Sequence, residues 1–392
     1  MSDTPAFDLY DAALQADPFG AYARLRDSAP VHVAQGPKGM PVYVLSRYDD
    51  VARALKEPQT FSSQVAPAPI LMFKDPPEHT RLRRTLARAF TPRAIDALAP
   101  RVEALACELY EPYLAAGGGD FVDAFAHPLP AMVIGEMLGI PTDRRRELRQ
   151  WSDDSIRALG GGIGLSKAER EAARGGAMQL FALLQDVLDG YRDRPGDTIG
   201  GELARLTQDA ELTADEALFF SQFLFVAGHE TTTALFACGA ALLARQPGLL
   251  DRLRAAPGEV PRFVEEVLRC TPSLHRLFRR TTQAVTLHGV TIPDGATVLL
   301  LLGAANRDPR RFPAGDSVAL DADPSGHLAF GGGIHMCLGA PLARLEGRIG
   351  FRLLIERTAR IALDPAQAAQ PVTGGTTSEF GWRSLPLLVE PV

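Results

Sequence analysis

The sequence predicts a mainly α-helical protein, a large helical bundle that carries a small β-rich lobe. Helical patterns dominate residues 100–244 and are broken only by short glycine-rich segments. Alternating apolar residues at 31–33 and 41–45 flank a Gly-Pro turn and predict two strands, and a second alternating region follows residue 274. We therefore expect one domain over residues 1–392, with its β-rich portion at roughly 30–60, 275–302 and 372–390.

Composition and charge exclude several classes of protein. The 392 residues are 46% hydrophobic, and a net charge of -6 gives no reason to expect nucleic acid as a partner. Four scattered cysteines are too few for a disulfide framework and favour a reducing cytoplasm. The N-terminal residues 1–17 lack the features of a signal peptide. The apolar run 217–244 is long enough to span a membrane, but polar residues interrupt it, so we expect a buried helix and no membrane.

A glycine-rich loop with a single cysteine lies at residues 330–341. Its glycines permit a tight turn and a close approach of the backbone to a flat ligand. Pro341 predicts the start of a helix, whose partial positive charge and free amides favour a thiolate at Cys337. The apolar face of this helix is expected to carry Leu342, Leu345, Ile349 and Leu353. No Cys or His partner lies at zinc spacing, so a metal bound here is expected to arrive in a macrocycle.

Phe330, Gly333, Cys337 and Gly339 together fit the pattern F-x-x-G-x-x-x-C-x-G. This pattern resembles the haem-ligand loop of the cytochrome P450 family, the haem-thiolate monooxygenases, in its soluble bacterial form. The resemblance implies haem b as the cofactor, Cys337 as the ligand of its iron, and Phe330 and Gly339 as further cofactor contacts. A buried structural cysteine and a dinucleotide-binding loop are the competing interpretations, although the glycine spacing is wrong for the latter.

A second group of candidate residues lies on the long apolar helix. Phe223, Ala227 and Thr231 recur every four residues and therefore share one face, with Gly228 beside them. Because two of these residues are small, Ala227 and Gly228 leave room for a flat cofactor. Thr231 can donate a hydrogen bond to the carbonyl of Ala227, which would loosen the helix and open a polar notch in an apolar wall.

Glu230 is the only formally charged residue within residues 217–244. A buried carboxylate is costly unless it has partners or a task. The segment 227–232 resembles the family's oxygen-activation motif, [AG]-G-x-[DE]-T-[TS]. The resemblance implies that Glu230 supplies protons and that Thr231 positions them and the oxygen. A purely structural Glu230 that caps or bridges to a distant arginine is the alternative.

Four further residues resemble the family's contacts to the haem propionates. His79 and Arg83 are four residues apart and share a helical face, Arg279 lies in a predicted strand, and His335 precedes the cysteine by two residues. The resemblance assigns all four to the cofactor. For the arginines, an ordinary solvated basic face is the alternative.

The substrate is expected to be small and apolar. Residues 64–77 form a proline-rich loop whose apolar run can line a pocket if it folds inward. His275 is the one polar candidate, able to orient a substrate oxygen, and a solvent-facing histidine is its alternative. The predicted substrate contacts are Ile70, Leu71, Phe73, Phe223, Val226, Ala227, Leu274, His275 and Phe380.

The family's motifs occur in the family's order from about residue 18 to 386, which implies activation of O₂ and hydroxylation or epoxidation of the substrate. Electrons must come from another protein because no flavin or iron–sulfur signature is present. The resemblance implies a ferredoxin with its reductase, and we expect the enzyme to be a monomer. The predicted docking residues are Arg81, Arg84, Arg88, Arg344 and Arg348.

Two other functions remain open. A peroxide-driven peroxygenase would keep Cys337 but generally lacks the pair formed by Glu230 and Thr231. A non-enzymatic haem sensor would need a signalling domain or a displaceable second ligand, for which His229 is the candidate.

Glu266 and Arg269 have the spacing of a helical ion pair. They resemble the family's structural Glu–Arg pair, which supports folding and haem retention. Many relatives add a third arginine before the haem loop, and this sequence has none there. Either Arg310 or Arg311 takes its place, or the network is smaller.

Overall fold

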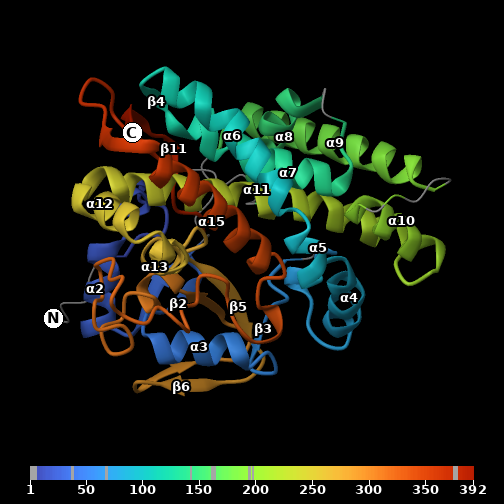
Figure 1. Cartoon of the computed structure of the whole chain (residues 1–392). Coiled ribbons are helices and arrows are strands. Elements are labelled where there is room, and N and C mark those ends of the chain that lie inside the picture. The colour runs from blue at the N-terminus through green and yellow to red at the C-terminus, as the bar shows by residue number, and fades with distance from the viewer. Residues whose placement is uncertain are drawn as a thin grey trace.

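The computed structural model describes residues 7–36, 39–66, 69–141, 144–159, 165–192, 196, 198–373 and 378–392. Helices dominate it, as the sequence predicts, and Figure 1 shows them gathered above a smaller β-rich lobe. The helices are α1 Ala12–Ala16, α2 Phe19–Ser28, α3 Tyr48–Lys56, α4 Glu78–Leu86, α5 Pro92–Asp96, α6 Ala99–Ala115, α7 Pro128–Leu138, α8 Arg145–Leu159, α9 Lys167–Gly190, α10 Ile199–Gln208, α11 Ala214–Arg245, α12 Pro247–Ala255, α13 Val260–Cys270, α14 Leu302–Ala305 and α15 Ala340–Arg357.

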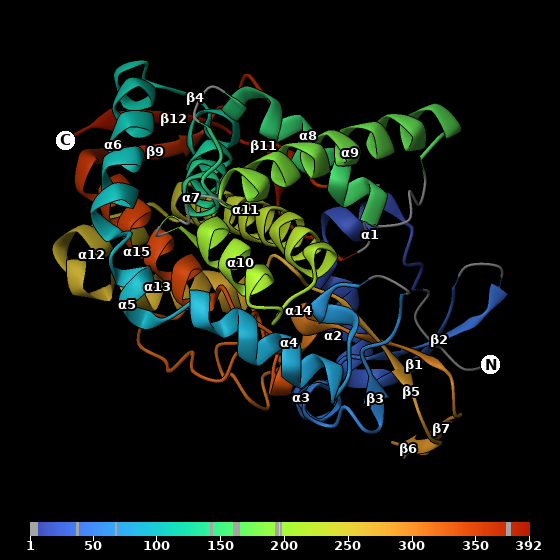
Figure 2. The same cartoon turned by 90° about the vertical axis from the view of Figure 1, so that its right-hand side faces the viewer.

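Helix α11 crosses the whole molecule between the other helices (Figures 1 and 2). Thr213 and Glu216 cap its N-terminus reciprocally, each side chain bonding the other's backbone amide. The helix packs against α7, α8, α9, α13 and α15, and most of its side chains are buried. The prediction of a buried core helix is confirmed.

Among the described residues no single helix is long and apolar enough to cross a membrane. Only α11 and α12 taken together reach that length and composition, and they are bent by 104° at the break between them.

A five-stranded sheet forms most of the β-rich lobe. Its strand order is β1-β2-β8-β5-β3, so the first two predicted strands pair with each other and the second of them pairs with β8. Strand β2 runs parallel to β8, and β8 pairs with β5 in antiparallel register, Arg279 opposite Val298. The strands are β1 Val31–Gln35, β2 Pro41–Leu45, β3 Phe61–Ser62, β5 Leu277–Thr281 and β8 Thr297–Leu300.

Three smaller sheets complete the described strands. Strands β6 Val285–Leu287 and β7 Val290–Ile292 form a hairpin, and β10 Gln370–Pro371 pairs with β11 Trp382–Ser384. A third sheet has the order β4-β12-β9, from Gly118–Asp120, Pro386–Pro391 and Thr358–Leu363. The glycines at 117–119 were expected only to break a helix. Instead Gly118 approaches Leu387 so closely that a β-carbon would lie 2.1 Å from its carbonyl oxygen.

The ion pair of Glu266 and Arg269 is fully buried, with an Nε–Oε1 distance of 2.7 Å. Its remaining hydrogen bonds go to the backbone, since Arg269 donates to the carbonyls of Asn306, Gly315 and Ser317. The amide of Ala319 donates to Glu266 at 2.6 Å. Backbone carbonyls therefore satisfy this arginine.

The predicted substitutes for a third arginine bond elsewhere. Arg310 pairs with Asp308 and Asp27, whereas Arg311 donates to the carbonyl of Ser325. Of the two expectations, the smaller network is the one observed.

Candidate active site

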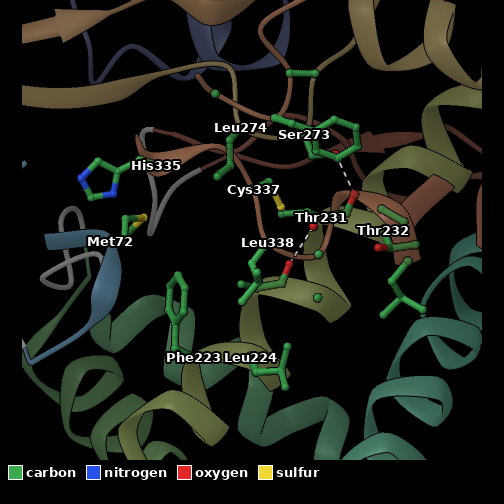
Figure 3. Close-up of a pocket in the computed structure, with 18 of the residues that line it drawn as sticks. Met72, Phe223, Leu224, Thr231, Thr232, Ser273, Leu274, His335, Cys337 and Leu338 are labelled. Carbon is green, nitrogen blue, oxygen red and sulfur yellow. Dashed lines mark hydrogen bonds between the residues drawn. The ribbon is translucent and has the colours of Figure 1, made fainter. Parts of the chain in front are cut away.

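A deep cavity lies between α11 and the glycine-rich loop that precedes α15. Helix α11 contributes Phe223, Ala227 and Thr231 to its wall, which confirms that these residues share one face. Figure 3 shows the sulfur of Cys337 directed into the space that Phe223 and Leu274 also border. Two chain segments more than 100 residues apart thus meet at one apolar chamber.

The loop around Cys337 is held by backbone contacts. The amide of Cys337 donates to the carbonyl of Phe330 at 2.9 Å. Gly333 has a φ of +62°, and a β-carbon there would lie 2.4 Å from the carbonyl oxygen of Leu55. Only glycine fits a position that combines this conformation with that approach. The predicted helix begins at Ala340, and the four apolar residues expected on its face are all buried.

The Cys337 thiol differs from expectation in one respect. Its sulfur accepts hydrogen bonds from the amides of Gly339 and Ala340, as the helix N-terminus predicts, and these bonds lower its pKa. The sulfur is exposed to the cavity, but its enclosure there removes it from bulk water, which acts in the opposite direction and raises the net pKa of the thiol. The amides alone therefore do not secure a thiolate, and a bound cation would provide the missing stabilisation.

The four predicted propionate contacts converge at one end of the cavity. Arg83, Arg279 and His335 line it, and the rings of His79 and His335 lie 4.3 Å apart. Burial, His79 and Arg279 lower the pKa of His335 to about 3. Burial also lowers the pKa of Arg279 to about 10.

Several nitrogens of this cluster have no acceptor within the described structure. Nε2 of His335 is buried without a hydrogen-bond partner, and the His79 ring is buried with only the backbone of Ile334 close enough to raise its pKa by hydrogen bonding. Such orphaned groups beside two arginines suit the carboxylates of a bound anion. Together with the cysteine sulfur and the flat apolar wall, they fit a haem.

Thr231 has the predicted hydrogen bond, with Oγ1 donating to the carbonyl of Ala227 at 2.7 Å. The hydroxyl of Ser273 donates to the carbonyl of Thr231 at 2.6 Å, a contact that sequence reasoning missed (Figure 3). Helix α11 nevertheless remains α-helical through this region, so the expected loosening is not seen. Gly228 lines the cavity, and a β-carbon there would meet Ile134 of α7 at 2.7 Å.

Glu230 does not line the cavity; its carboxylate joins a polar cluster beside α8. Ser152 donates to Glu230 at 3.3 Å, and Asp153 is hydrogen-bonded to it. Burial raises the pKa of Glu230 well above its ordinary value, and the charges of Asp153 and Glu379 raise it further. Burial and Asp153 raise the pKa of Glu379 to about 7. These effects all favour the protonated form of Glu230, which is adjacent in sequence to the cavity-lining Thr231.

Glu346 is a cavity-lining acid that the sequence analysis missed. Its side chain is fully buried, and neither carboxylate oxygen has a hydrogen-bond partner within the described structure. Burial raises its pKa to about 8. The signal for it was present, since Glu346 follows Leu342 by four residues and lies on the apolar face of α15.

The predicted substrate residues divide into two groups. Leu71, Phe223, Ala227 and Leu274 line the cavity, and Met72, from the apolar run of the proline-rich loop, joins them. Ile70 lines only a small adjoining cavity. The described lining does not include Phe73, Val226, His275 or Phe380.

The expectation for His275 requires correction. Leu274 forms a bridge with Glu379, and adjacent residues of an extended chain point to opposite sides. His275 therefore faces away from the cavity, where its Nδ1 lies 2.9 Å from the hydroxyl of Tyr22. Phe380 packs there as well, 5.0 Å from the ring of Phe19.

The predicted docking arginines are partly neutralised. Arg81 pairs with Glu216, and Arg88 lies 2.7 Å from Glu211. Arg344 forms two hydrogen bonds with Glu265, at 2.7 and 2.8 Å. Arg84 and Arg348 are exposed. Three of the five arginines therefore have acidic partners, and the docking role of the five stays a prediction.

Known proteins resemble this chain over nearly its whole length. A family model described as cytochrome P450 matches residues 197–371. The cytochrome P450 monooxygenase PikC of Streptomyces venezuelae is 37% identical, covering 89% of this chain and 86% of its own length. The mycinamicin IV hydroxylase/epoxidase of Micromonospora griseorubida is also 37% identical, covering 88% and 89%. The solved structure of CYP109Q5 from Chondromyces apiculatus has a TM-score of 0.87 at 32% identity and covers 98% of each chain.

Proposed function

Because this chain belongs to the cytochrome P450 family and is thus a haem-dependent monooxygenase, we propose that it inserts one oxygen atom into a small apolar substrate held between α11 and the cysteine loop. The observation that carries this proposal is the shared cavity of Cys337 and Thr231, with Glu230 directly behind the threonine. Hydroxylation and epoxidation are the two outcomes proposed.

Haem b is the family's cofactor, and we assign its contacts to residues of this cavity. Cys337 is the proposed iron ligand, and His79, Arg83, Arg279 and His335 are the proposed propionate contacts. The other assigned contacts are Ala227, Gly228, Phe330 and Gly339. When bound, haem supplies the iron at which O₂ is reduced and an oxygen atom is transferred.

Glu230 and Thr231 are the residues proposed to supply protons. Glu230 holds a proton because burial and two neighbouring carboxylates raise its pKa. Thr231 Oγ1 donates its hydrogen to the carbonyl of Ala227, so its lone pairs are free to accept a hydrogen bond on the cavity side. The apolar wall excludes water and thereby limits unproductive loss of reducing equivalents.

The substrate class follows from the cavity lining. Leu71, Met72, Phe223 and Leu274 offer an apolar surface to a terpenoid, steroid, fatty acid or polyketide. A relative from Pseudonocardia autotrophica is named a vitamin D(3) 25-hydroxylase, and CYP109E1 of Bacillus megaterium has been solved with testosterone. A screen for compounds that shift the haem absorbance from low to high spin would identify binders.

The remaining proposals concern context. A ferredoxin with its reductase is the proposed electron donor, since bacterial members of the family draw on redox partners. All four cysteines are free thiols, which supports a cytoplasmic location. We also propose that residues 1–392 act as one domain and as a monomer.

The test of the acid–alcohol pair is Thr231→Ala. Removing the hydroxyl is expected to lower product formed per reductant consumed at least fivefold, with less change in the rate of reductant use. Thr233→Ala is the matched control, because Thr233 bonds back to the carbonyl of His229 at 3.0 Å and does not line the cavity. Unchanged coupling in Thr231→Ala would remove the proposed role of the hydroxyl.

A peroxide-driven reaction is the competing chemistry. Turnover with hydrogen peroxide alone, at a rate matching ferredoxin-driven turnover, would favour it. A haem sensor with His229 as second ligand receives no support, because the His229 ring is buried beside Ser152 and outside the cavity lining.

A further inference from the structure

Two histidines and a glutamate meet behind α11, on the side away from the cavity. His127 precedes α7, and His229 and Glu230 are neighbours on α11. One ligand atom from each of the three residues lies within 4.8 Å of the others. Both histidines are buried, and the Glu230 side chain keeps 20% of its exposure, which leaves the cluster accessible at one edge.

The separations approach those of a tetrahedral metal site. His229 Nδ1 lies 3.4 Å from Glu230 Oε1, and His127 Nε2 lies 4.0 Å from the same oxygen. Zinc bonds of about 2.0–2.1 Å place tetrahedral ligands roughly 3.3 Å apart. Of the three pairs, the first already matches, the second requires a movement of well under 1 Å, and the two imidazole nitrogens lie within 4.8 Å of each other.

The tautomer of His229 also suits a metal. Its Nε2 lies 3.2 Å from the carbonyl oxygen of His127, and a carbonyl can only accept, so Nε2 carries the hydrogen. The lone pair of Nδ1 can therefore accept, and the hydroxyl of Ser152 has one hydrogen to share between Nδ1 at 2.9 Å and Glu230 Oε1 at 3.3 Å. A metal-binding imidazole is typically held by such a bond from its second nitrogen to a carbonyl.

Two neighbours on α8 affect how a metal could bind. Asp153 is hydrogen-bonded to Glu230 but does not belong to the group of ligand atoms within 4.8 Å of one another, so the protein offers three ligands. Ser152 Oγ lies 2.9 Å from His229 Nδ1 and 3.3 Å from Glu230 Oε1, so its hydroxyl occupies the approach to both atoms. A metal must displace this hydroxyl.

We propose that His127, His229 and Glu230 form a binding site for a zinc ion, whose fourth ligand is a water molecule. Imidazole and carboxylate ligands in this number favour Zn²⁺ over Mg²⁺ or Ca²⁺, which prefer all-oxygen sites. A zinc ion held by Glu230 occupies the carboxylate that the proposed function uses. On that proposed function, zinc blocks proton supply and acts as a reversible inhibitor of productive turnover.

The test measures zinc directly, by equilibrium dialysis of the haem-loaded enzyme against ZnCl₂ with excess Mg²⁺ present. We expect one Zn²⁺ per chain. His127→Phe, which keeps an aromatic ring, is expected to weaken binding at least tenfold, whereas Ser152→Ala, which removes the competing hydroxyl, is expected to strengthen it. His288→Ala is the control, because His288 is a half-exposed histidine 2.8 Å from Asp50 that can bind zinc adventitiously.

Three results would overturn the proposal: no bound zinc, binding unchanged in His127→Phe, or binding lost in His288→Ala. A second measurement separates the metal site from the catalytic role. Thr231→Ala is expected to bind zinc as the wild type does, whatever its turnover. If zinc binds as predicted but leaves coupling unchanged, the site stands and the proton-supplying role of Glu230 fails.

Discussion

Glu346 allows a prediction whose size follows from the structure. Its carboxyl is fully buried without a hydrogen-bond partner in the described structure, and burial raises its pKa from 4.5 to about 8. Between these two pH values the unfolded chain loses this proton while the folded protein keeps it. In this range the folded state binds more protons than the unfolded state. The contribution of Glu346 to the free energy of unfolding is therefore fully present below pH 4.5 and is lost as the pH rises toward 8.

The perturbation is Glu346→Gln, which cannot ionise. At 1.36 kcal/mol per pKa unit, wild type should lose roughly 3 kcal/mol of unfolding free energy relative to the variant between pH 5 and pH 8. The assay is urea unfolding of the haem-loaded proteins across this range. The difference between the two proteins matters more than either value, since a buried amide without partners carries its own pH-independent cost.

Glu356→Gln is the matched control, a substitution at an exposed glutamate on the same helix, α15. Its effect on unfolding free energy should stay within about 0.5 kcal/mol at every pH. If the Glu346→Gln difference also varied by less than about 1 kcal/mol, the carboxyl would be solvated or paired in the folded protein, and the reasoning from burial would be refuted.

Two further predictions concern charged groups inside the helical core. Arg269→Lys keeps the charge but loses hydrogen bonds to three backbone carbonyls. We therefore expect the free energy of unfolding in urea to fall by about 2–4 kcal/mol and haem to be lost on gel filtration. A fall of less than about 1 kcal/mol would contradict this prediction. Asp153→Asn removes a charge that raises the pKa of Glu230 and of Glu379, so both carboxyls should lose their protons at lower pH. The pH above which product per reductant declines should therefore fall, and an unmoved profile would exclude Asp153 from proton supply.

Local periodicity was enough to predict several elements. The apolar positions of α15 recur at helical spacing, and Leu342, Leu345, Ile349 and Leu353 are buried as predicted. The same reasoning placed Phe223, Ala227 and Thr231 on one face of α11. These patterns depend only on the geometry of one helix, so a single sequence contains them.

Pairing between distant segments was not predictable in this way. Strand β4 joins β12 across more than 260 residues, and its Gly-Gly-Asp sequence has no strand pattern. The error at His275 has a local cause, since the bridge from Leu274 to Glu379 sets which of two adjacent side chains faces the cavity. The partners of Glu230 come from three separate elements, so spacing along the chain could not indicate them.

The polar cluster around Glu230 and the apolar cavity lie on two different faces of α11. Glu230 and Thr231 are adjacent, so one residue step around the helix leads from the cluster beside Asp153 to the cavity wall. Thr231 Oγ1 already donates its hydrogen to the carbonyl of Ala227. To pass a proton into the cavity, the hydroxyl must therefore either accept a second proton or break its hydrogen bond to Ala227. Ser273 secures the carbonyl of Thr231 from the other side, which keeps the backbone in place while the hydroxyl moves. On the proposed role of Glu230, transfer of a proton into the cavity therefore requires the Thr231 hydroxyl to turn away from the carbonyl of Ala227.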